Sequence, residues 1–190
     1  MQVTILGHSY VRDLSRLGHK KLRIEALADV SVSYEAFPGI KFSHFLESPE
    51  LLEGVFALQP DFLVVILGGN DFDNFTSLDE VKSSAETFYR LLRENLPNTK
   101  IFATQVETRF YKTGNKFGCP VGDLYKYITN YFNKKLRKLP GVDNLICVLG
   151  PGRLSNRELF KEDGVHLKVK GLHKLWDIIK TFLYKKILEN

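Results

Sequence analysis

The sequence predicts a three-layer α/β/α sandwich, with helices on both faces of a parallel sheet of about five strands. Short apolar runs rich in β-branched residues alternate with longer segments of helical period, which is the pattern of successive strand–helix–strand units. The run 62–67 has no polar alternation, as expected of a central strand that is covered on both faces. The runs that we assign to strands are 3–6, 31–34, 62–67, 101–104 and 145–148.

Helix signals stand between these runs. Ser48 before Pro49 combines an N-cap with a proline that suits a first helical turn, and Ser77 stands three residues before Glu80, the spacing of a capping box. Three segments carry apolar residues at spacings of three and four, which is typical of helices packed on a sheet. These residues are Leu78, Val81, Ala85, Phe88, Leu92 and Leu96; Leu124, Ile128, Tyr131, Phe132, Leu136 and Leu139; and Leu172, Leu175, Trp176, Ile179 and Leu183.

The totals indicate a globular protein with one domain, residues 1–190. Hydrophobic residues make up 44% and charged residues 26% of the chain, and no apolar run approaches the ~20 residues that span a bilayer. The N-terminus has no basic leader, so we expect an intracellular, cytoplasmic protein. The two cysteines, Cys119 and Cys147, support neither a disulfide framework nor a cysteine-based zinc site.

The chain carries a net charge of +5, and its basic residues cluster at 19–23 and 134–138. Such clusters attract polyanions, and they are also common on solvated helix faces and loop ends. Both interpretations stay open, and the oligomeric state is not predicted.

The residues that could carry chemistry follow the predicted strands. In open α/β sheets, ligands bind beyond the carboxyl ends of the strands, so residues just after each strand are the first candidates. Four short segments stand out, the last of them near the C-terminus: Gly7-His8-Ser9, Phe37-Pro38-Gly39, Gly68-Gly69-Asn70-Asp71 and Asp163-Gly164-Val165-His166.

With these four blocks in this order, the chain resembles the SGNH (GDSL-like) hydrolase family over nearly its whole length. Each block alone is a weak signal, but the joint arrangement, with an acid three residues before a late histidine, is specific. The resemblance implies a flavodoxin-like sandwich and a serine esterase without a cofactor or metal, acting on small acetyl or short acyl esters of carbohydrates or lipids. Similar domains occur in animal retroelement proteins.

Ser9 is the nucleophile that this resemblance implies. A serine hydroxyl is a poor nucleophile at neutral pH unless a base takes its proton. His166 would take that proton and return it to the leaving alkoxide, while Asp163 would hold the imidazole in the useful tautomer. The resemblance further implies an oxyanion hole made by the backbone N–H groups of Ser9 and Gly39 and the side-chain amide of Asn70.

Simpler interpretations compete with each role. Ser9 also suits a helix N-cap, Gly39 an ordinary turn after Pro38, and Asn70 a plain loop position. One residue departs from the family: His8 stands where an aspartate usually precedes the nucleophilic serine. The alternative is therefore a catalytically degenerate binding module on the same fold, within a larger nucleic-acid-associated protein.

Residues 105–122 form the longest irregular segment and interleave cations with aromatic residues. Such a segment serves as a lid over a cleft, as a nucleic-acid contact, or as an ordinary exposed loop. We assign further substrate contacts to His8, Asp71, Arg109 and Phe110. The segment at Ser9 lacks the second glycine of a Gly-x-Ser-x-Gly elbow. Asp71, Asp73 and Asp79 lack the spacing of a metal-binding loop.

Overall fold

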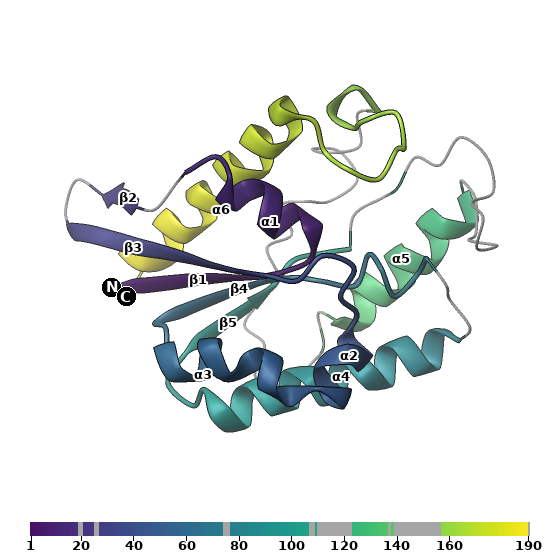
Figure 1. The fold of residues 1–190 in the computed structure, drawn as a ribbon, viewed down its shortest axis with the longest axis horizontal. Helices are drawn as coiled ribbons and strands as arrows, with labels where there is room; N and C mark the ends of the chain where they lie inside the picture. Colours follow the sequence, from purple (N-terminus) through teal and green to yellow (C-terminus); the bar gives the residue numbers. More distant parts are fainter. Residues whose placement is uncertain are drawn as a thin grey trace.

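The computed structural model describes residues 1–18, 21–24, 27–73, 77–106, 109, 123–136, 138 and 157–189. Its sheet has the strand order β2-β3-β1-β4-β5 (Figure 1). Four strands run parallel, and β2 at the edge runs antiparallel to β3. The strands are β1 (Gln2–Gly7), β2 (Lys21–Ile24), β3 (Leu27–Ala36), β4 (Phe62–Ile66) and β5 (Lys100–Ala103).

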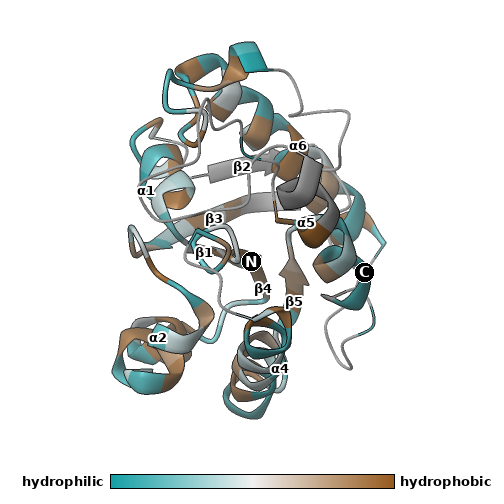
Figure 2. Cartoon of the chain, turned by 90° about the vertical axis from the view of Figure 1, so that its right-hand side faces the viewer, coloured by the Kyte–Doolittle hydropathy of each residue, from teal (hydrophilic) through white to brown (hydrophobic). Residues whose placement is uncertain are grey.

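Helices cover both faces of this sheet (Figures 1 and 2). On one face lie α1 (Ser9–Ser15) and α6 (Val169–Leu188), and on the other lie α2 (Phe42–Glu47), α3 (Glu53–Leu58), α4 (Leu78–Asn95) and α5 (Asp123–Leu136). Two short 3-10 helices, Pro49–Leu52 and Arg157–Leu159, complete the described elements. The predicted three-layer α/β/α architecture is confirmed.

The strand β4 explains why the sheet needs helices on both sides. All five of its residues are buried. Phe62, Val64 and Ile66 pack with α1 and α6, whereas Leu63 and Val65 pack with the helices of the other face. This alternation divides the core into two clusters, as expected of a strand without a solvent face.

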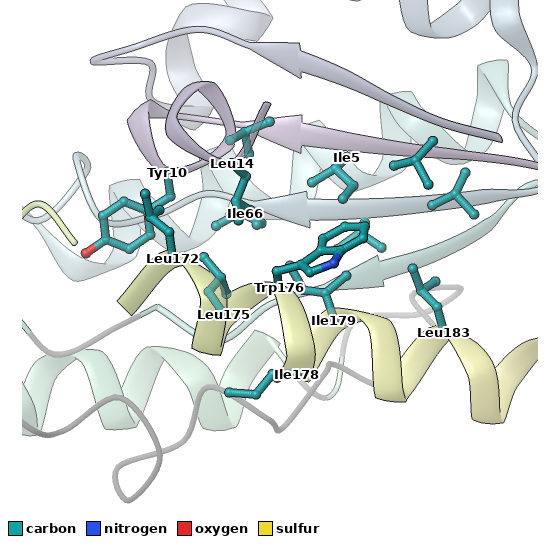
Figure 3. Close-up of a cluster of buried hydrophobic side chains, with 14 of the residues drawn as sticks. Ile5, Tyr10, Leu14, Ile66, Leu172, Leu175, Trp176, Ile178, Ile179 and Leu183 are labelled. Carbon is teal, nitrogen blue, oxygen red and sulfur yellow. The ribbon is translucent and has the colours of Figure 1, made fainter. Parts of the chain in front are cut away.

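The apolar face of α6 shows how the core cluster on the side of α1 and α6 forms. Leu172, Leu175, Trp176, Ile179 and Leu183 are buried at the predicted spacings. In Figure 3 these side chains lie against Ile5, Leu14 and Ile66, which belong to β1, α1 and β4. On the opposite face, Ser77 caps α4 by accepting a hydrogen bond from the Glu80 N–H at 3.5 Å, as its capping-box spacing predicts.

The strands differ from the prediction at the edge of the sheet. Residues 21–23 of the first basic cluster form part of the edge strand β2, where solvated helix faces or loop ends were expected. Lysine is common on edge strands because its charge opposes pairing with another chain. The predicted strand 145–148 lies outside the described residues. Within the described ranges, none of the helices is both long and apolar enough to cross a membrane.

The order of the strands marks one position for a site. From β1 the chain crosses to β3 on one side and later to β4 on the other, so the two neighbours of β1 are reached in opposite directions. Ligands of open α/β folds bind at such a switch point, beyond the carboxyl ends of the strands. Ser9 follows β1 at this edge.

Candidate active site

The turn from β1 to α1 places Ser9 at the first position of the helix. His8, not Ser9, is the N-cap, and its ring Nδ1 accepts a hydrogen bond from the Tyr10 N–H at 3.4 Å. The His8 carbonyl accepts from Val11 and Arg12. Within the described part of the chain, the Ser9 N–H has no acceptor, so it remains available as a donor at a helix N-terminus.

Gly39 lies in a tight turn beside this segment. The Phe37 N–H donates to the Gly7 carbonyl at 2.8 Å, which ties the turn to the end of β1, and the Ile40 N–H closes it by donating to the Phe37 carbonyl at 3.1 Å. Pro38 and Gly39 occupy the central positions, and Gly39 has φ +82°, as a type II turn requires. Gly39 is exposed, which leaves its backbone open to a ligand.

Asn70 and Asp71 join the turn after β4 to the Gly39 turn. The Asn70 Nδ2 donates to the Ile40 carbonyl at 2.9 Å. The next residue, Asp71, is buried and its Oδ1 accepts from the Phe42 N–H at 3.1 Å, at the start of α2. Burial raises the pKa of Asp71 to about 6, although the Phe42 N–H and nearby positive charges oppose this rise. Two adjacent side chains thus fasten the two loops together.

Arg109 is buried beneath the same turn. Its guanidinium pairs with Asp73 and donates from Nη2 to the Asn70 Oδ1 at 3.1 Å. A Cβ at position 69 would lie 2.6 Å from the Arg109 Nη2, so this approach requires the glycine found there. The residue that the sequence assigns to substrate contact is therefore held internally, against Asn70.

Asp163 and His166 form a compact pair in the segment before α6. The Asp163 Oδ2 lies 2.8 Å from the His166 Nδ1, and the Asp163 Oδ1 accepts from the N–H groups of Val165 at 2.8 Å and His166 at 2.9 Å. Burial raises the pKa of Asp163, but these hydrogen bonds outweigh it and hold the pKa below its usual value. Among the described residues, the His166 Nε2 has no hydrogen-bond partner.

A bond across 155 residues brings this pair to the N-terminal part of the site. The Tyr10 hydroxyl donates to the Val165 carbonyl at 2.5 Å. The electrostatics agree with this placement, because burial, followed by electrostatic interactions with Arg109 and His166, lowers the pKa of His8 to about 3. His8 is thus a neutral, buried imidazole that lies near both residues.

A small cavity lies beside His8 and Arg109. His8, Tyr10, Gly69 and Arg109 are among the residues around a cavity of about 10 Å³, close to the volume that one water molecule needs. Hydrogen bonds, and not this cavity, link the segments of the four sequence blocks: Phe37 to Gly7, Asn70 to Ile40, and Tyr10 to Val165. Phe110 lies outside the described residues, as does most of the segment 105–122.

Sequence reasoning missed two contributors to this arrangement. Tyr10 links α1 to the Asp163 segment, and Asp73 balances the charge of Arg109. An arginine after β5 and an acidic stretch after β4 are visible in the sequence, but the pairing between them is not, because no periodic pattern relates the two segments.

Solved structures of hydrolases have the same fold as this chain. A lipase/acylhydrolase from Enterococcus faecalis matches with a TM-score of 0.65 at 17% identity, over 98% of this chain and 97% of its own. The acetyl xylan esterase AlAXEase matches with a TM-score of 0.61 at 18% identity, over 93% and 98%. The esterase EstA from Pseudoalteromonas sp. matches with a TM-score of 0.60 at 15% identity, over 96% and 98%.

A family model identifies the family of this chain, although the search of curated proteins found no match to its sequence. The family model of GDSL-like lipases/acylhydrolases matches residues 12–179, most of the chain, and the structural neighbours include SGNH hydrolases. The resemblance to this family is confirmed, and the chain belongs to the GDSL-like lipase/acylhydrolase family.

Proposed function

We propose that the chain is a serine esterase that hydrolyses small carboxylic esters, with acetyl or short acyl groups. The observation that carries the proposal is the Asp163–His166 pair, held at 2.8 Å and fastened to the helix of Ser9 through the Tyr10–Val165 hydrogen bond. A nucleophile, a base and a group that orients the base are the minimum for acyl transfer through serine.

The chemistry starts at the Ser9 hydroxyl. Its Oγ attacks the ester carbon while the His166 Nε2 takes its proton, and Asp163 stabilises the imidazolium that forms. The protonated His166 then gives that proton to the leaving alkoxide, which departs as an alcohol and leaves an acyl group on Ser9. Water, activated by His166 in turn, releases the acid and restores Ser9.

Three N–H donors would hold the oxyanion. The Ser9 N–H starts α1, where the helix end favours negative charge, and the Gly39 N–H lies in the turn tied to Gly7. The Asn70 Nδ2 has two hydrogens, of which the Ile40 carbonyl takes one. Preorganised donors of this kind contribute about 10²–10³ each to the rate.

We infer that the acyl group of the substrate is small. The chain belongs to the family of GDSL-like lipases/acylhydrolases, whose model matches residues 12–179. One structural neighbour, 18% identical, is an acetyl xylan esterase, which is consistent with a preference for acetyl groups.

The test is hydrolysis of p-nitrophenyl acetate. Ser9→Ala and His166→Ala abolish turnover, and Asn70→Ala lowers kcat by about 10²-fold because one oxyanion donor is lost. A fluorophosphonate probe adds its mass to the wild type and not to Ser9→Ala. Ser15→Ala, at the other end of α1, is the matched control and keeps full activity and labelling. Hydrolysis retained by Ser9→Ala would rule out the proposal.

A further inference from the structure

The side-chain amide of Asn70 has a defined orientation. Its Nδ2 donates to the Ile40 carbonyl at 2.9 Å, and its Oδ1 accepts from the Arg109 Nη2 at 3.1 Å. If the amide were rotated by half a turn, its oxygen would face a carbonyl oxygen and its nitrogen would face a guanidinium. Both contacts would then be repulsive, since neither pair contains a donor and an acceptor. The two neighbours therefore select the same orientation.

The guanidinium that makes this selection is itself held in place. Arg109 is 5% exposed and its Nη1 pairs with the Asp73 carboxylate. Its Nη2 packs against Gly69, where any side chain would collide with it. A buried arginine needs such a partner because an unpaired buried charge is strongly unfavourable. Asp73 and Gly69 thus hold the guanidinium in the position from which its Nη2 donates to Asn70.

The geometry points to Arg109 as a positioning residue for ester hydrolysis, which sets the amide of Asn70 so that one Nδ2 hydrogen faces the developing oxyanion. This role rests on the proposed function, in which Asn70 is an oxyanion donor. Asp73 holds Arg109 and acts one step further away. A charged donor on the amide oxygen also polarises the amide and strengthens its N–H groups as donors.

The neutral state of His8 explains how this side chain can lie near the charge of Arg109. A histidine beside an arginine would be repelled if it were protonated. Here the imidazole is buried and neutral, with its Nδ1 accepting from Tyr10. Arg109 therefore meets a neutral ring at this position, and Asp73 pairs with its charge.

The experiment is a double-mutant cycle on p-nitrophenyl acetate hydrolysis. Arg109→Gln combined with Asp73→Asn removes both charges together, so no buried charge is left unpaired. In the wild-type background this pair lowers kcat by about tenfold and leaves KM nearly unchanged, because one charge-assisted hydrogen bond is lost. In the Asn70→Ala background the same pair has little further effect. Arg16→Gln, on the exposed end of α1, is the control and changes neither constant.

Two outcomes overturn the assignment. An equal tenfold loss in the Asn70→Ala background means that Arg109 does not act through Asn70, and a change confined to KM means that it acts on substrate binding. Arg109→Lys, which can donate one bond but not a planar pair, recovers part of the lost kcat.

A spectroscopic measurement separates this inference from the proposed function. The ¹⁵N signal of the Asn70 Nδ2 moves upfield in the Arg109→Gln/Asp73→Asn variant, because the amide oxygen loses a charged donor, and it does not move in Arg16→Gln. An enzyme without Ser9-dependent hydrolysis would disprove the esterase, whereas an unmoved Asn70 signal would disprove the positioning role.

Discussion

At the scale of single residues, His8 has acquired a structural task of its own. His8 stands where the SGNH (GDSL-like) family usually has an aspartate. The side chains of aspartate and of neutral histidine can both accept a hydrogen bond from the first turn of a helix. In this chain the neutral imidazole accepts from the Tyr10 N–H and so caps α1. Compared with an aspartate at this position, His8 still caps the helix but brings no negative charge to the site.

We therefore expect His8→Ala to destabilise the protein by about 1 kcal/mol, which is the usual effect of losing an N-cap. His8→Asn restores most of this stability, because its amide oxygen accepts from the same N–H without adding charge. The free energy of unfolding in urea measures both effects. If His8→Ala and His8→Asn were equally stable, the capping role would be wrong.

Asp71 is a second residue whose surroundings predict a measurable effect. It is buried, its Oδ1 accepts from the Phe42 N–H, and among the described residues its Oδ2 has no hydrogen-bond partner. Burial raises its pKa from 3.8 to about 6 in the folded protein. The folded state then binds this proton more tightly than the unfolded state does, so deprotonation costs stability as the pH rises through this interval.

Asp71→Asn should remove this cost, because an amide cannot ionise and its oxygen still accepts from Phe42. Compared with the wild type, the variant gains stability as the pH rises from about 4 to about 6, reaching on the order of 1–3 kcal/mol at neutral pH. Urea unfolding at several pH values measures the difference. Asp177→Asn, exposed on α6, is the control and shows no such trend. Parallel curves for Asp71→Asn and the wild type would contradict the prediction.

At the scale of elements, α1 and the segment 161–168 act as one unit. The segment is closed by the bond from the Lys161 N–H to the His166 carbonyl at 2.7 Å and by a bridge between Phe160 and Leu167. The Tyr10 hydroxyl then joins this closed segment to α1. This side-chain bond and the burial of Phe160 and Leu167 in one core with Tyr10 position His166 beside α1.

Tyr10→Phe should therefore reduce activity more than stability. Losing one hydrogen bond costs about 1 kcal/mol of folding free energy, whereas a small displacement of His166 lowers kcat by about tenfold or more. Activity on p-nitrophenyl acetate and urea unfolding of the same samples test this ratio. Tyr131→Phe, on an exposed side chain of α5, leaves both quantities unchanged. Wild-type kcat in Tyr10→Phe would show that the bond does not position His166.

The elements differ in how well the sequence predicts them. The strand β4 follows from an unbroken apolar run, because it is buried on both faces. The helices α4 and α6 follow from apolar residues at spacings of three and four, because each is buried along one face. Helix α2 has six residues, too few for a period, and β2 pairs at an edge with only four. Short elements take their structure from neighbours in space, which a single sequence does not reveal.

The sequence likewise predicts some parts of the candidate site and not others. Ser9, Gly39 and Asn70 could be placed at one edge from the sequence because each follows a predicted strand, and parallel strands end together. The contact between Arg109 and Asn70 could not be predicted, because it depends on the packing of the Arg109 side chain against Gly69, which no sequence pattern indicates. The bond between Tyr10 and Val165, which lie 155 residues apart in the chain, depends on how α6 packs.

At the scale of the whole molecule, the sheet separates two hydrophobic cores, and segments that extend from both cores form the candidate active site. One core joins α6 to β1 and β4, and the other joins α2 and α4 to the opposite face of the same strands. His166 is carried by the first core, whereas Gly39 and Asn70 belong to loops that lead into the second. The sheet edge between them fixes the distance from base to oxyanion donors, so either core can disturb the site when its packing changes.

The Tyr10–Val165 bond also has a consequence for the synthesis of the protein. A ribosome that makes this chain delivers Ser9 early and His166 late, after the strands of the described sheet have emerged. During that interval the nascent chain carries its candidate nucleophile without a base. Under the proposed function, a growing polypeptide of this sequence therefore hydrolyses esters only after α6 docks.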